Sequence, residues 1–353
     1  MIRIGNRFVD ISHDYLVLAA QIGVQGGVVR LECFPGFKEN GRPDPVELKK
    51  IIIMFKDLGM DIPGIEIRRE LMVGALRGES DRRAQEIKHL SESMHIAADQ
   101  GINLMTIGFG VAHADDDRSG WRGYQDEPIG RAGAMVRSFD ASRISEKDMV
   151  TWGNPDQGLS GILVSREECW RRLDAFLEPL LPVMRATGIR VAFHPNDPPL
   201  PLYRGVQQLF TTIDSQQDLL DRYKEPLLGL TYCCGTMHES GGDVVEGIRR
   251  YGSVGKIFNV HFRNVKGRIP KFQEVFQDDG DYDSVAVMRS LHQIGFDGYV
   301  MADHLPALSV DIEEAPVFLL HGLPTSTRNV SFAWSVGYLR ALVQSTFPHG
   351  LQA

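Results

Sequence analysis

The chain has 353 residues, 43% of them hydrophobic, and a formal net charge of −8 at pH 7. This length exceeds the roughly 250 residues of a minimal eight-stranded α/β barrel, and the acidic balance without a Lys/Arg cluster argues against a nucleic-acid partner. No apolar run approaches the ~18 residues of a membrane span and no signal-peptide pattern opens the chain, so we expect no membrane partner and a cytoplasmic location.

Apolar, β-rich runs alternate with segments of helical periodicity, which is typical of a parallel sheet. The strands predicted in chain order are Ile2–Phe8, Gly27–Phe34, Ile62–Ile67, Ile102–Phe109, Ile189–His194, Leu228–Cys233, Ile257–Phe262 and Gly298–Asp303. The helices predicted between and after them are Pro45–Leu58, Ser80–Gln100, Ser165–Thr187, Ser215–Arg222, Asp243–Tyr251, Ser284–Ile294 and Ser331–Ser345. Eight such strands predict one α/β domain over residues 1–353, a (β/α)₈ TIM barrel.

The clearest helical signal covers Ser165–Thr187. Ser165 and Glu168 have the spacing of a capping box at its start, and Gly188 follows its end. An apolar stripe runs between them at Leu173, Phe176, Leu177, Leu180, Leu181 and Met184. The pattern predicts one amphipathic helix that leads directly into the next strand.

Residues 110–163 interrupt this alternation with a stretch rich in Gly, Asp, Arg and Ser. Active sites of such barrels are built from loops at the carboxyl ends of the strands, and long insertions in compact domains are commonly functional. We therefore predict an inserted loop or lid region after the fourth strand, which could also form the contact of a homo-oligomer. A disordered surface loop is the alternative.

Four predicted strands end in a side chain that can bind a metal: His194, Cys233, His261 and Asp303. The intervals between them are close to the ~30-residue length of one βα unit, so four successive strands would bring them to one end of the barrel. Two imidazoles, a thiolate and a carboxylate suit Mn²⁺, Fe²⁺, Co²⁺ or Zn²⁺ better than Ca²⁺ or Mg²⁺. Each residue alone has an ordinary structural explanation, but four in register predict a metal site.

The chain has four cysteines, Cys33, Cys169, Cys233 and Cys234, which are too few for a disulfide scaffold. Cys233 and Cys234 are adjacent, so on a strand they point to opposite faces. The alternation of Leu228, Leu230 and Tyr232 with Gly229, Thr231 and Cys233 favours Cys233 as the ligand, with Cys234 as its rival.

Several segments resemble the D-mannonate dehydratase family of the xylose-isomerase-like barrels. They are residues 194–199 (HPNDPP), 229–236 (GLTYCCGT), 260–265 (VHFRNV), 276–281 (FQDDGD) and 302–304 (ADH), with 130–134 (GRAGA) and 138–140 (SFD) as further similar stretches. The resemblance is close over most of residues 165–305 and loose in the N-terminal part.

The resemblance implies dehydration of an aldonic acid to a 2-keto-3-deoxy acid, with Mn²⁺ bound by His194, Cys233, His261 and Asp303. It also implies that His304 acts as the catalytic acid/base; the alternative role for His304 is a hydrogen bond that supports a ligand. Arg263 lies on the same strand face as His261 and could pair with a substrate carboxylate, and Glu66 and Asn264 are candidates for binding hydroxyls.

The chain departs from the family pattern in three places. It lacks the family's catalytic tyrosine, for which residues 322–333 are the corresponding stretch, and Tyr338 is expected to pack against the barrel instead. Met301 replaces an arginine of the family, and residues 107–110 lack an expected polar residue. Because these changes spare the predicted metal ligands, we expect a metal-dependent lyase whose substrate is a sugar acid or a related keto-sugar.

Two other functions are compatible with the sequence. Related barrels use a metal and paired acid/base groups to move protons between carbons, so a sugar isomerase or epimerase is the enzymatic alternative. A metal-containing binding protein that has lost catalysis is the second, and His304 argues against it.

Overall fold

The computed structural model describes residues 1–111, 121–152, 161–313 and 329–346. Eight parallel strands close into a barrel in the order β1-β14-β11-β10-β7-β4-β3-β2. Their bounds are β1 Arg3–Phe8, β2 Gly26–Arg30, β3 Asp61–Ile67, β4 Leu104–Gly108, β7 Arg190–His194, β10 Leu228–Cys233, β11 Ile257–Phe262 and β14 Tyr299–Ala302. The prediction of a (β/α)₈ barrel is confirmed, and all eight predicted strands lie within a few residues of the observed ones.

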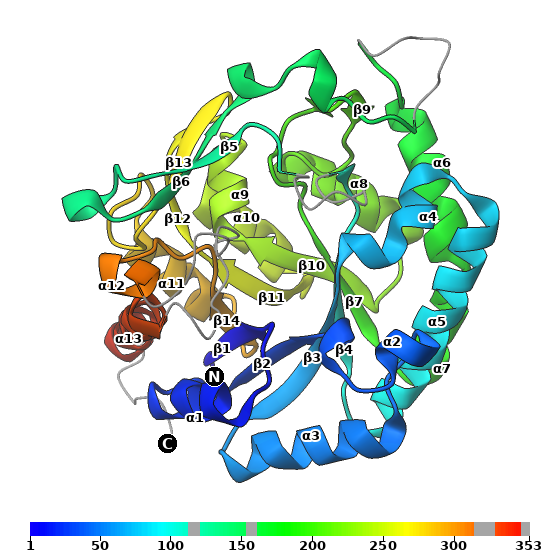
Figure 1. Ribbon diagram of the computed structural model, residues 1–353, viewed down its shortest axis with the longest axis horizontal. Helices are drawn as coiled ribbons and strands as arrows, with labels where there is room; N and C mark the ends of the chain where they lie inside the picture. The colour runs from blue at the N-terminus through cyan, green and yellow to red at the C-terminus, as the bar shows by residue number, and fades with distance from the viewer. Residues whose placement is uncertain (112–120, 153–160, 314–328, 347–353) are drawn as a thin grey trace.

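Helices surround the strands on the outside of the barrel (Figure 1). The longer ones are α1 His13–Gln21, α3 Pro45–Asp57, α5 Ser80–Asp99, α6 Arg166–Leu177, α7 Leu181–Thr187, α8 Ile213–Tyr223, α10 Val244–Gly252, α11 Ser284–Gln293 and α13 Asn329–Thr346. Shorter helices are α2 Phe37–Asn40, α4 Val73–Arg77, α9 Cys234–Glu239 and α12 Ser309–Glu313. In the described part of the chain, no helix has the length and apolarity needed to span a bilayer.

Two predicted elements differ from the observed ones. The helix predicted over Ser165–Thr187 is divided into α6 and α7 by a 3₁₀ turn, Glu178–Leu180, where Pro179 and Pro182 lack the N–H groups of a continuous α-helix. The Ser165 side chain caps α6 as expected. The second strand stops at Arg30, and a 3₁₀ turn at Leu31–Cys33 leads to Pro35.

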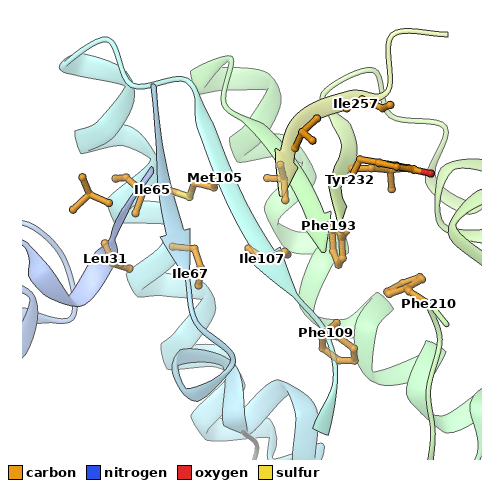
Figure 2. Packing of buried hydrophobic residues seen from close by; sticks show 14 of the residues in the cluster. Leu31, Ile65, Ile67, Met105, Ile107, Phe109, Phe193, Phe210, Tyr232 and Ile257 are labelled. Carbon is orange, nitrogen blue, oxygen red and sulfur yellow. The ribbon is translucent and has the colours of Figure 1, made fainter. Parts of the chain in front are cut away.

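The main core lies between the strands and the helices. Ile65 and Ile67 of β3 and Met105 and Ile107 of β4 point into it from neighbouring strands (Figure 2). Leu173 of α6 is fully buried in the same core.

We expect Leu173→Ala to lower the free energy of unfolding by about 2–5 kcal/mol, because it removes buried methyl groups and leaves a cavity. The urea midpoint of the purified protein measures this loss. Val46→Ala is the matched control, because Val46 is 64% exposed on α3 and its truncation should change stability by less than about 0.5 kcal/mol. Equal losses in the two variants would contradict the assignment of Leu173 to the core.

The barrel interior is filled by a separate apolar layer. This layer comprises Val28, Leu104, Ala192, Phe258, Tyr299 and Met301. Residues two positions further along a strand share the same face, so Arg30, His194 and Asp303 are presented directly above this floor, at the carboxyl end of the barrel. Gly64 belongs to the same arrangement, because a Cβ there would lie 3.0 Å from a methyl of Val28.

A second, antiparallel sheet is attached to this end of the barrel. Its strands are β12 Asn264–Arg268, β13 Lys271–Val275, β6 Val136–Asp140 and β5 Tyr124–Glu127, in the order β12-β13-β6-β5. β5 and β6 come from residues 110–163, and β12 and β13 form the loop that follows β11 (Figure 1). A short pair, β8 Leu202–Tyr203 and β9 Val206–Gln207, lies in the loop after β7.

Candidate metal centre

Four side chains capable of binding a metal meet at the carboxyl end of the barrel. His194 ends β7, Cys233 ends β10, His261 is the penultimate residue of β11, and Asp303 directly follows β14. One donor atom of each lies within 4.8 Å of those of the other three. The imidazole centroids of His194 and His261 are 5.0 Å apart. The structure therefore brings together the four residues that the sequence analysis selected as ligands.

The two adjacent cysteines face different surroundings. Cys233 belongs to the four-residue group, and the hydroxyl of Thr236 donates a hydrogen bond of 3.1 Å to its sulfur. Cys234 packs in the main core outside the barrel. Burial raises the pKa of the Cys233 thiol to about 12 in the ligand-free protein, so its conversion to a thiolate needs a nearby cation.

The donor set fits a divalent transition-metal ion. His261 Nε2 is buried and has no hydrogen-bond partner among the described residues, which is unusual for a polar atom in a folded protein. His194 Nδ1 lies 2.8 Å from the carbonyl oxygen of Pro195, so in the neutral ring Nδ1–H donates and Nε2 carries the lone pair. Two imidazoles with one thiolate and one carboxylate are ligands that such ions prefer.

Asp303 is held as a carboxylate by its neighbours. Burial alone would raise its pKa, but His304, His261 and Arg7 keep the pKa well below its ordinary value. Arg7 Nη1 donates a 2.7 Å hydrogen bond to Asp303 Oδ1, and Asp303 Oδ2 lies 3.5 Å from His261 Nδ1. The carboxylate is therefore oriented with one oxygen toward Arg7 and the other toward the histidines.

Glu66, predicted to bind a substrate hydroxyl, lies on the opposite side of Arg7 from Asp303. Its two oxygens accept hydrogen bonds from Arg7 and, at 3.3 Å, from Arg30 Nε. Burial opposes ionisation of Glu66, but these two arginines lower its pKa far below the ordinary value. Glu66 is thus beside the metal-capable group, and its negative charge is neutralised by Arg7 and Arg30.

Arg263 forms the centre of a second buried cluster. Its guanidinium contacts Asp197 at 2.7 Å and Glu274 at 3.5 Å, is hydrogen-bonded to Glu239, and lies 3.6 Å from Asp303. The side chain is only 1% exposed. These carboxylates occupy the guanidinium, so the geometry favours a positioning role over the expected contact with a substrate carboxylate.

His304 is oriented by this second cluster. Its Nδ1 lies 2.8 Å from Glu274 Oε1 on β13, and its Nε2 lies 3.9 Å from Asp303 Oδ2. Its backbone has φ 44°, a left-handed conformation that a non-glycine residue adopts at a cost of about 1–3 kcal/mol. The left-handed backbone and the contact with Glu274 together direct the imidazole toward the metal-capable group. An acid/base would need this orientation.

Asn264 lies away from the position expected for it. Its Nδ2 donates to the carbonyl oxygens of Gln277 and Tyr282 and to the hydroxyl of Ser284, and its Oδ1 accepts from the Val265 N–H. The side chain therefore holds the loop after β11, and the geometry gives no support to a contact with a substrate hydroxyl.

Several residues near the site were missed from the sequence. The hydroxyl of Tyr124 on β5 donates to Asp197, and the ring of Trp121 meets His304 edge-on with centroids 6.1 Å apart. Burial, then the charge of Asp197, raises the pKa of Tyr124 well above its ordinary value, so the hydroxyl stays protonated. Asp197 had a signal in the sequence, the polar HPNDPP turn after a strand, but residues 110–163 showed no periodicity that would have placed Tyr124 here.

Two expectations concerned the C-terminal part of the chain, the missing tyrosine and the packing of Tyr338. Residues 322–328 of the stretch that corresponds to the family's tyrosine lie outside the described residues. Tyr338 stacks on Trp334 of α13, with ring centroids 5.5 Å apart, and packs against the main core as expected. It therefore has a packing role.

Comparison with known proteins points to one family. The family model of D-mannonate dehydratase (UxuA) matches residues 162–344. Mannonate dehydratase 2 of Halalkalibacterium halodurans is 31% identical over 185 residues, covering 46% of this chain and 53% of that protein. Mannonate dehydratase of Thermotoga maritima is 32% identical over 145 residues, covering 40% of each chain. The match thus spans only about half or less of these curated relatives.

Solved structures extend the likeness in fold to the whole chain. A mannonate dehydratase from Streptococcus suis has a TM-score of 0.77 at 20% identity and covers 100% of this chain and 99% of its own. A 3-keto-D-glucoside 4-epimerase from E. coli covers 97% of this chain and 100% of its own, with a TM-score of 0.60 at 12% identity. Since the family model covers more than half of the sequence, the chain belongs to the D-mannonate dehydratase family.

Proposed function

We propose that the protein is a metal-dependent hydro-lyase that dehydrates a sugar acid by β-elimination. D-Mannonate, converted to 2-keto-3-deoxy-gluconate, is the first substrate to test, and a related polyhydroxy or keto-sugar substrate is the next. The observation that carries the proposal is the convergence of His194, Cys233, His261 and Asp303, with His304 beside them. We propose Mn²⁺ as the resident ion, with Fe²⁺, Co²⁺ and Zn²⁺ as alternatives.

A divalent ion bound at these residues would act as a Lewis acid toward the oxygens of the substrate and would favour loss of the proton next to the carboxylate. His304 is the group of this chain that moves protons. Because Glu274 fixes its Nδ1, its Nε2 is the nitrogen that accepts the proton from carbon or delivers one to the departing hydroxyl. Arg263 holds the buried side chains of Asp197 and Glu274 in place.

In this proposal, residues 121–152 cover the site at the carboxyl end of the barrel. Trp121 lies edge-on to His304, and Tyr124 fixes Asp197. An aromatic wall of this kind excludes water, which strengthens the electrostatic interactions within the site. We therefore assign the inserted region of the single barrel domain the role of a lid.

The decisive experiment incubates the manganese-loaded protein with D-mannonate and other aldonic acids and follows the products by mass spectrometry. Dehydration is expected to yield a product lighter by one water, with one carbon-bound deuterium when the reaction runs in D₂O. The His304→Asn variant under the same conditions is the control. An active preparation that gives only products of unchanged mass would contradict the proposal.

An epimerase is the second candidate, favoured by the fold shared with epimerases and by the paired acid/base groups His304 and Glu274. It would incorporate deuterium into a 3-keto sugar without any loss of mass, so the same experiment separates the two. A binding protein without catalysis would retain metal and show neither product.

A further inference from the structure

Arg137 lies on the face of the small antiparallel sheet that is turned toward the barrel. It is on β6, and its partner across the ladder is Glu274 of the neighbouring strand β13 (Figure 1). Directly opposite residues of an antiparallel pair project from the same face of the sheet. Because Glu274 contacts His304, the side chain of Arg137 projects on the side where the candidate acid/base lies.

The guanidinium of Arg137 is enclosed by aromatic rings of the inserted region. The residue is only 7% exposed, and its Cζ lies 5.8 Å from the ring centroid of Trp121 and 5.9 Å from that of Tyr124. Trp121 also meets the imidazole of His304 edge-on. One indole ring therefore borders both the guanidinium and the candidate acid/base.

Arg137 keeps an unused donor in this buried setting. Its Nε lies 3.4 Å from Asp126 Oδ1, which is long for a hydrogen bond between charged groups. Nη1 is buried and has no hydrogen-bond partner among the residues that the structure describes. A buried donor without a partner is costly, and in native proteins it marks a place for water or a ligand.

Arg263, the arginine that the sequence suggested for a substrate carboxylate, has no such capacity. Its guanidinium already contacts Asp197, Glu239 and Glu274. In Arg137 the one polar side-chain contact within the described chain is made through Nε, so the outer edge of the guanidinium remains for a ligand. A planar pair of charged N–H donors is the geometry that suits a carboxylate.

We propose that Arg137 binds the carboxylate of the substrate, so that the inserted region selects an acid over a neutral sugar. This inference rests on the proposed function, in which a sugar acid reacts beside His304. It adds a residue of the inserted region to the recognition of substrate, and it separates an acid from the neutral keto sugar of the epimerase alternative.

The test measures binding apart from turnover. D-Mannonate and its neutral amide are titrated calorimetrically into manganese-loaded His304→Asn protein, in which loss of the acid/base slows turnover. Adding Arg137→Met should weaken binding of the acid by roughly 10- to 100-fold, the contribution of a charged hydrogen-bonded pair, and binding of the amide by less than about tenfold. Arg137→Lys, which keeps the charge without the planar pair of donors, should lose less.

Arg143→Met is the matched control. Arg143 contacts Ser138 and Glu127, and Ser138 is adjacent to Arg137 on β6, so its side chain lies on the opposite face of the sheet. Both affinities should be unchanged in this variant. The metal content and the urea midpoint of each variant show whether it is folded and loaded.

Two results would overturn the assignment. One is an Arg137→Met protein with full metal content that binds the acid as tightly as its parent. The other is an equal fold-loss for the acid and the amide, which would show that Arg137 only shapes the wall formed with Trp121. An acid that binds through Arg137 but is not dehydrated by the wild type contradicts the proposed function and leaves this subsite in place.

Discussion

Replacing Cys233 by alanine is expected to lower the metal content from about one divalent ion per chain to less than a tenth of that value. Cys233 is one of the four proposed ligands, and loss of even a supporting contact commonly costs 10- to 100-fold in metal affinity. Because the Lewis acid contributes several kcal/mol to such reactions, kcat should fall by at least about 10³-fold. Elemental analysis of the purified protein measures the first effect and also identifies the native ion.

The neighbouring cysteine provides the control for this experiment. Cys234 is as deeply buried as Cys233 but packs in the core outside the barrel, so Cys234→Ala should lose a similar amount of stability and keep its metal. Full metal occupancy in Cys233→Ala would refute the ligand assignment. Metal loss in both variants would show that the effect comes from packing.

His304→Asn is expected to lower kcat by about 10²- to 10⁴-fold while the metal content stays near one ion per chain, because it removes a proton-transfer group and no ligand. Asparagine is chosen because it tolerates the left-handed backbone at this position better than most residues. Elemental analysis and initial rates on the same preparation separate the two effects.

Glu274→Gln distinguishes a catalytic imidazole from a structural one. The amide can still contact Nδ1 of His304 but replaces the carboxylate that orients the ring, so kcat should fall less than in His304→Asn. A His304→Asn protein that retains more than a tenth of wild-type kcat would remove His304 from the mechanism.

The sequence was sufficient to predict the barrel and its metal-capable group because both depend on short, regular patterns. The alternation of residues along the strand was enough to place Cys233 in the barrel interior and Cys234 outside the barrel. The structure has the two side chains in these places. His194, His261 and Asp303 each stand at the end of a predicted parallel strand, and this position was enough to place them at the same end of the barrel.

The second cluster could not be predicted in the same way. Arg263 meets Glu239 and Glu274 only because a helix and a hairpin fold back over the strand end, and nothing local marks these pairs. Asn264 shares the VHFRN segment with His261 but begins β12, where its side chain satisfies the backbone of the following loop. The left-handed backbone of His304 is likewise set by its packed surroundings.

The small antiparallel sheet has a mechanical consequence. Glu274, which holds the imidazole of His304, is paired in register with Arg137 on the strand contributed by the inserted region. If the inserted region acts as the proposed lid, its displacement would also move the Glu274 carboxylate that holds His304. We therefore expect proton transfer by His304 to require the proposed lid in its closed position.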